Sequence, residues 1–97
     1  MSIKSNRSIW GKPFPVGGEW DAGYIRLEGG RTDGFVFVRR TETAFEVVRR
    51  KYHPNGVGEN EVVKAFPVNG LTDDEVDAVE VEAKAYALDV RNALSGV

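Results

Sequence analysis

The stretch FVFVRRTETAFEVVRRKY, residues 35–52, contains the same pattern twice. In each half an alternating apolar run ends in two arginines, and a short polar connection, Thr-Glu-Thr, joins the halves. Alternation with a period of two is typical of a β-strand that buries one face. A connection this short joins antiparallel strands, because parallel neighbours need a crossover of about a dozen residues or more. The stretch therefore predicts a β-hairpin within an antiparallel sheet.

Two further segments have the composition of strands. Residues 22–28 (AGYIRLE) alternate, and the glycine-rich residues 29–34 connect them to the hairpin. Residues 61–68 (EVVKAFPV) follow a loop, residues 53–60, that contains a Pro-Asn-Gly turn signal. Because proline cannot donate to a strand ladder, Pro67 indicates a strand end or an edge. The sheet is therefore expected to have three or four strands.

Residues 71–96 carry the signals of a helix. Thr72 precedes Glu75 by three residues, which is the capping-box pattern, and Gly96 suits a C-terminal stop. Apolar residues recur at steps of mostly three and four, so they form one stripe, which we expect to lie on the sheet. This stripe comprises Val76, Val79, Ala83, Tyr86, Ala87, Val90 and Leu94.

A second apolar stripe lies on the far side of the predicted helix, at Ala78, Val81, Ala85 and Leu88. Scattered apolar residues are normal on protein surfaces. The same residues would equally form a contact surface for a partner, or for a second copy of the chain in a homodimer. Both interpretations stay open at the level of the sequence.

These elements predict one α+β domain, residues 21–97. It would consist of an antiparallel sheet of three or four strands, with one long C-terminal helix packed across one face. The chain has 97 residues, enough for one small core. The first twenty residues are rich in glycine and proline and predict an extended arm. Apolar side chains that would dock this arm are Ile9, Trp10, Phe14 and Trp20.

Composition leaves little material for catalysis. The chain has no cysteine, which excludes disulfides and thiolate chemistry, and its one histidine, His53, precedes a proline in a loop. The carboxylates at 73–77 suit a helix N-terminus. We therefore expect no enzymatic activity, no metal and no cofactor. No apolar run is long enough to cross a bilayer, and the first residues lack a signal peptide's apolar region, so we expect a cytoplasmic protein without membrane contact.

The two arginine pairs form the candidate site. Side chains alternate across a strand, and the face that carries Phe35 and Phe37 has the greater apolar volume, so we expect it under the helix. The opposite, open face would then carry Val36, Val38, Arg40, Glu46, Val48, Arg50 and Tyr52, with Arg39, Arg49 and Lys51 at its rim.

Five cations within thirteen residues would concentrate positive potential on one patch, which favours nucleic-acid backbones through counterion release. A two-stranded ribbon also fits the major groove, where arginine reads guanine. The competing interpretation is that adjacent arginines keep strand ends soluble and pair with acidic neighbours. The predicted partner is double-stranded DNA, and the predicted binding residues are Arg39, Arg40, Arg49, Arg50, Lys51 and Tyr52.

Residues 33–95 contain GFVFVRR, AFEVVRRKY, NEVVKAFPVNG and EAKAYALDVRNAL. This series resembles the three-stranded-sheet-plus-helix DNA-binding domains of plant ethylene-response factors and of phage integrase arm-binding regions. In such domains the sheet face away from the helix lies in the major groove. The resemblance therefore implies a DNA-binding role for Arg40, Glu46, Arg50 and Tyr52.

Charge is divided unevenly along the chain. Residues 1–67 hold eleven Lys and Arg against eight Asp and Glu, whereas residues 68–97 hold two against seven. A pI of about 5.4 is low for a general polyanion binder. The alternative hypothesis is a small phage-type interaction module, or an inhibitor of host nucleic-acid machinery such as an anti-CRISPR-like protein. It would act through its acidic helix, at Asp77, Val81, Glu82, Ala85, Leu88 and Asp89.

Overall fold

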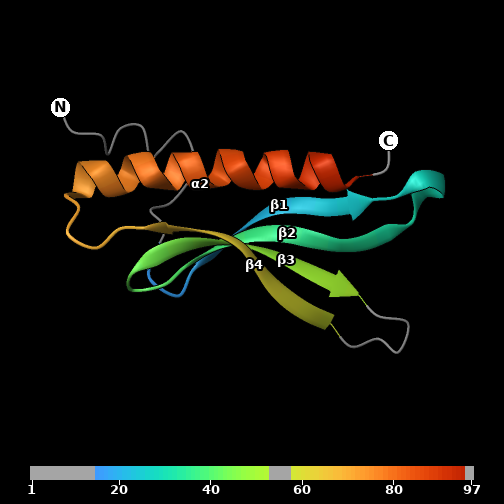
Figure 1. The fold of residues 1–97 in the computed structure, drawn as a ribbon, viewed down its shortest axis with the longest axis horizontal. Coiled ribbons are helices and arrows are strands. Elements are labelled where there is room, and N and C mark those ends of the chain that lie inside the picture. The colour runs from blue at the N-terminus through green and yellow to red at the C-terminus, as the bar shows by residue number, and fades with distance from the viewer. Residues whose placement is uncertain (1–14, 53–57, 96–97) are drawn as a thin grey trace.

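The computed structural model describes residues 15–52 and 58–95. Its elements are β1 (Glu19–Arg26), a short 3-10 turn η1 (Glu28–Gly30), β2 (Thr32–Arg40), β3 (Ala44–Tyr52), β4 (Gly58–Pro67) and α2 (Asp73–Leu94). The four strands form one antiparallel sheet in the order β1-β2-β3-β4. Figure 1 shows α2 lying along one face of this sheet. The predicted fold class, an antiparallel sheet with one long C-terminal helix, is confirmed.

Three strands begin earlier than the sequence pattern indicates. β2 starts at Thr32, within the predicted glycine-rich connection. β1 starts at Glu19, so Glu19 and Trp20, expected at the end of the arm, belong to the sheet. β4 starts at Gly58, because the end of the predicted loop pairs with the end of β3. Ile9, Trp10, Phe14 and His53 lie outside the described residues.

The helix begins where its capping box predicts. The Glu75 amide donates to Thr72 Oγ1 at 3.3 Å, and the Thr72 amide donates to Glu75 Oε1 at 2.9 Å. These bonds satisfy two of the amides that a helix N-terminus leaves without intrahelical partners. At the other end the Ser95 amide donates to the Arg91 carbonyl at 3.1 Å. Gly96, the predicted stop, lies outside the described residues.

The core lies between α2 and the first three strands. The stripe predicted to face the sheet does so, with Ala83 and Ala87 fully buried and the other five members packed against them. Alanines at the centre of the contact let the helix backbone approach the sheet closely. From the sheet, the core receives Ala22, Ile25, Val36, Val38, Phe45 and Val47.

The predicted orientation of β2 was wrong. Val36 and Val38 are 0% exposed in the core under α2, so Phe35, Phe37 and Arg39 lie on the face away from the helix. Directly opposed residues of two strands share a face, and Val38 opposes Val47 in the core. Valines fit the narrow space beneath the helix alanines, whereas the phenylalanines pack with aromatic neighbours on the other side. For β3 the prediction was right.

Within the described residues, no helix combines the length and apolar character that crossing a membrane requires.

Candidate nucleic-acid interface

The fold separates the arginine pairs to opposite ends of the β2–β3 hairpin. Arg39 opposes Glu46 near the turn, whereas Arg50 opposes Phe35. Phe35 and Arg39 are four residues apart on β2, which corresponds to about 13 Å along a strand. The expected single patch of five cations was therefore wrong, because antiparallel pairing brings the end of one strand to the start of the next.

The two sheet faces also divide the cations. We call the face away from α2 the open face. Arg39 and Arg50 lie on it, beside Phe37 and Val48. Arg40 was predicted there too, but it opposes Phe45 of the core and lies on the helix side. Arg49 and Lys51 alternate onto the helix side as well, since they occupy odd-numbered positions like Phe45 and Val47.

Most hairpin cations have acidic partners. Arg39 Nε lies 2.7 Å from Glu46 Oε1, and an Arg49 terminal nitrogen lies 3.2 Å from Asp33 Oδ2. The Lys51 ammonium lies 3.5 Å from Glu61 Oε1. Arg40 instead donates to the Thr41 carbonyl and lies over the Phe45 ring, 5.0 Å from its centroid. These pairs fit the interpretation in which strand-end arginines are partnered by neighbours.

Arg50 has a different environment. A terminal nitrogen of its guanidinium donates to the Asn60 amide oxygen at 3.1 Å, a neutral acceptor. The group passes over Gly58, where a β-carbon would come within 2.5 Å of a guanidinium nitrogen. No carboxylate within ion-pair distance compensates the Arg50 charge in the described part of the chain. Of the two hairpin cations on the open face, Arg39 is paired with Glu46, whereas Arg50 can bind an anionic ligand without first breaking an ion pair among the described residues.

An aromatic cluster surrounds Phe35 on the open face. Its ring centroid lies 5.9 Å from that of Tyr24, 5.5 Å from that of Phe37 and 6.2 Å from that of Tyr52. Phe37 is 4% exposed, whereas Tyr24 is 53% and Tyr52 42% exposed. Three adjacent strands therefore present partly or largely exposed rings to solvent, and the central ring, that of Phe35, also packs against the buried Phe37.

Four residues cross the open face as one line. Tyr24 opposes Phe35, Phe35 opposes Arg50, and Arg50 opposes Asn60, so each strand contributes one side chain. We call these residues the aromatic row. Neighbouring strands lie about 4.8 Å apart, so the row spans roughly 14 Å. It offers two π-surfaces, a guanidinium and an amide in that order. Sequence reasoning identified Arg50 and the adjacent Tyr52 but missed Tyr24 and Phe35, whose grouping depends on the register.

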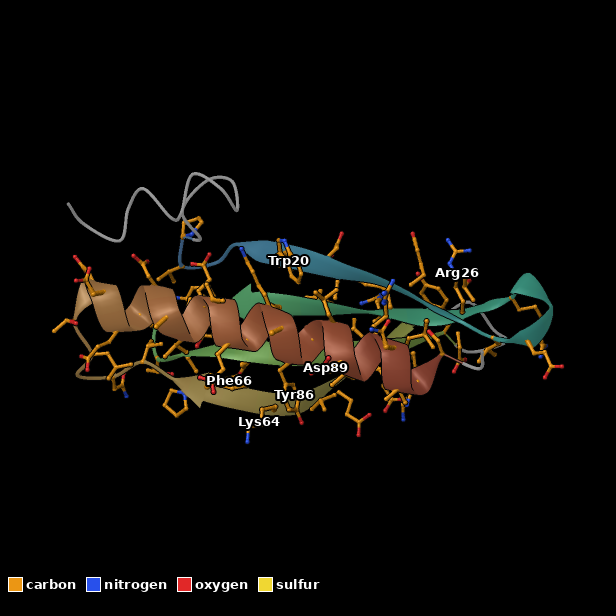
Figure 2. All side chains as sticks on the ribbon, turned by 90° about the horizontal axis from the view of Figure 1, so that it is seen from above. Trp20, Arg26, Lys64, Phe66, Tyr86 and Asp89 are labelled. Carbon is orange, nitrogen blue, oxygen red and sulfur yellow. The ribbon has the colours of Figure 1, made fainter. Side chains whose placement is uncertain are left out.

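The residues of the alternative hypothesis divide between two sides of α2. Val81 is 44% and Leu88 37% exposed, and with Trp20, Lys84 and Ala85 they line an apolar hollow of about 90 Å³. Trp20 reaches this hollow from β1 (Figure 2). The predicted exposure of the second stripe is confirmed, whereas its use by a partner or in a homodimer stays a prediction.

Asp77 does not belong to that exposed surface. It is only 9% exposed, because it lies on the side of α2 that also carries the buried Glu80 and Lys84. Lys84 Nζ lies 3.1 Å from Glu80 Oε2 and 5.3 Å from the centroid of the Trp20 ring. The predicted placement of Asp77 in an exposed contact surface was therefore wrong.

Glu82 and Asp89 lie on the side of α2 that faces β4, away from the hollow near Trp20. They line a groove of about 320 Å³ with Lys64, Phe66, Ala85 and Tyr86. Figure 2 shows Lys64 and Phe66 on β4 beside Tyr86 and Asp89 of the helix. The ammonium of Lys64 lies 5.7 Å from the Phe66 ring centroid and 6.0 Å from that of Tyr86. The acidic residues of this groove thus share it with the ammonium group of Lys64.

Across residues 15–52 and 58–95, no three histidine or carboxylate side chains converge as a metal site requires. Comparisons with protein-family models, with curated proteins and with solved structures found no match to this chain. The resemblance to sheet-type DNA-binding domains therefore stays a prediction.

Proposed function

We propose that the protein is a non-enzymatic nucleic-acid-binding module that uses the open face of its sheet. The observation that carries this proposal is the aromatic row, in which exposed rings stand beside an arginine that has no carboxylate partner among residues 15–52 and 58–95. Unpaired bases stack on aromatic side chains, and a guanidinium binds phosphate. Both groups are oriented by strands, so little conformational freedom is lost on binding.

A single strand suits this face better than a duplex. Duplex reading requires arginines that are free to reach base edges, and Arg39 and Arg49 are held by carboxylates. The exposed rings of Tyr24 and Tyr52 offer π-surfaces, which bases inside a duplex cannot use. The chain's net charge of −2 gives no long-range attraction to phosphate. We therefore expect micromolar affinity and a modest salt dependence.

The test is fluorescence anisotropy with short labelled oligonucleotides, as single-stranded DNA, single-stranded RNA and duplex DNA, at about 50 and 200 mM salt. We expect binding to at least one single strand. Tyr24→Ala should weaken it about tenfold, because each stacked base contributes about 1–3 kcal/mol. Arg50→Gln should also weaken it and reduce the salt dependence.

Two variants serve as controls. Leu88→Ala removes an exposed apolar side chain from α2, and Arg31→Gln removes an exposed cation outside the row. Both should bind like the original chain. Absence of binding at low salt, or equal losses in row and control variants, would contradict the proposal. A clear preference for duplex would restore the major-groove hypothesis.

The exposed apolar residues of α2 favour a second candidate, a protein-interaction module such as an inhibitor of nucleic-acid machinery. Val81 and Leu88 line the hollow near Trp20, Glu82 and Asp89 line the groove toward β4, and the exposed Ala85 lines both, which suits a partner with a basic and apolar contact surface. In this case Val81→Asp and Leu88→Asp would break a complex that tolerates Arg50→Gln, measured by co-purification with an identified partner.

A further inference from the structure

β4 forms one edge of the sheet. It spans ten residues, Gly58–Pro67, and pairs with β3 along its inner side. Among the described strands, none pairs with its outer side. All side chains from Glu59 to Ala65 are exposed, including Val62 at 46% and Val63 at 38%. A long strand with an open row of amides and carbonyls is a template for pairing with another chain.

The opposite edge is less suited to such pairing. β1 has two irregularities in its register, between Asp21 and Gly23 and between Tyr24 and Arg26. Irregular spacing interrupts the row of backbone donors and acceptors and adds local twist. β4 has one irregularity, near its middle, with regular pairing on both sides.

That irregularity changes which side chains share a face. Val47 opposes Lys64 and the next residue, Val48, opposes Val62, so Val63 is an extra residue in a β-bulge. In a regular strand, residues three positions apart point to opposite faces. Here Glu61 opposes Arg49 and Lys64 opposes Val47, and both partners lie on the helix side of β3. Glu61 and Lys64 therefore point to the same side.

This arrangement makes β4 complementary to itself. When two β4 strands run antiparallel about a two-fold axis between Val62 and Val63, Glu61 opposes Lys64 of the second copy. The symmetry produces this pair twice. Asn60 opposes Ala65 of the second copy, and both side chains lie on the open face. Beyond the central Val62 and Val63, each residue of one β4 strand therefore opposes a residue of the other that points to the same face of the sheet. Opposite charges directly across an antiparallel pair are favourable, and a two-fold interface requires such self-complementarity.

We propose that the chain forms a homodimer by pairing the β4 edges of two copies, with Glu61 and Lys64 setting the register. The interface covers Val62 and Val63 and joins the two sheets into one of eight strands. Glu61 already lies near Lys51, through Oε1 at 3.5 Å, and its second carboxylate oxygen suits Lys64 of the other copy. The inference uses none of the residues in the aromatic row except Asn60, so it is independent of the proposed function.

The test is sedimentation equilibrium of the full chain over a wide concentration range. Glu61→Lys places lysines opposite each other twice, and Lys64→Glu does the same with glutamates. Each variant alone should dimerise at least tenfold more weakly than the original chain. An equimolar mixture of the two should form a heterodimer, because every charge then opposes its opposite. The double variant with both substitutions should recover homodimerisation.

Both positions are exposed, so the variants should keep their fold, which circular dichroism checks. Glu28→Lys, in η1 on the exposed surface, is the matched charge-reversal control and should dimerise normally. A chain that stays monomeric at several hundred micromolar would overturn the proposal. So would a dimer that is unaffected by the β4 variants but lost on Leu88→Asp, since its interface would be the second stripe of α2.

Discussion

Gly34 controls how closely β2 approaches β3 beside the aromatic row. Its φ angle is +112°, in a region that L side chains rarely adopt, and the residue is buried. A β-carbon at this position would lie 1.8 Å from the carbonyl oxygen of Arg50. Neither strain nor collision can be relieved by a side-chain rotation, because both involve backbone. The glycine thus keeps Phe35 in place across from Arg50.

We therefore predict that Gly34→Ala destabilises the protein by about 3 kcal/mol or more, since positive-φ strain alone costs about 1–3 kcal/mol. Chemical unfolding followed by circular dichroism measures this. Gly30→Ala is the matched control: Gly30 has a φ of +83°, but nothing lies within 4 Å of its added β-carbon. Its cost should stay near 1 kcal/mol. Similar costs for both would show that the contact with Arg50 is unimportant.

Single residues also show where sequence reasoning ends. Alternation located β2 and β3, since it is a local property of the chain. It did not assign the faces of β2 correctly, because both alternating series of that strand are apolar and the greater volume of Phe35 and Phe37 favoured the wrong one. The choice depends on the small alanines of α2 and on the pairing of Val38 with Val47, which are tertiary facts. The aromatic row was missed for the same reason.

At the level of elements, the start of α2 was the most predictable feature. Its capping box involves residues three positions apart, so the sequence contains both partners. The bulge in β4 is the opposite case. It exists only relative to β3, and no residue type between Glu61 and Lys64 indicates it. Local hydrogen bonding is therefore predictable here, whereas register is not.

The capping box has a measurable contribution. Thr72→Ala removes the hydroxyl that accepts from the Glu75 amide and should lower the free energy of unfolding by about 1 kcal/mol. The comparison is Asn69→Ala in the preceding exposed turn, which should change it by less than about 0.5 kcal/mol. Thr72→Ser should retain most of the original stability, because serine caps as well as threonine. Failure of serine to do so would indicate a role for the threonine methyl group.

On the scale of the whole molecule, helix and sheet share one core. Val36, Val38 and Val47 are fully buried only because α2 covers them (Figure 1). We predict that a chain ending at Gly70 does not unfold cooperatively, since its sheet would expose that apolar face. Thermal melts and amide chemical-shift dispersion measure this. A full-length chain with Val81→Asp and Leu88→Asp, on the exposed side of α2, should remain folded and cooperative.

The bulge at Val63 also determines how two aromatic rows would be presented to a ligand. Because of the bulge, opposed residues of the two β4 strands point to the same face, so both open faces of the proposed dimer lie on one side of the joined sheet. The two-fold axis reverses their direction. A nucleic-acid strand has a 5′ and a 3′ end, so one strand running straight across would meet the second row backwards. The dimer would instead suit two strands of opposite direction, or one strand folded back on itself.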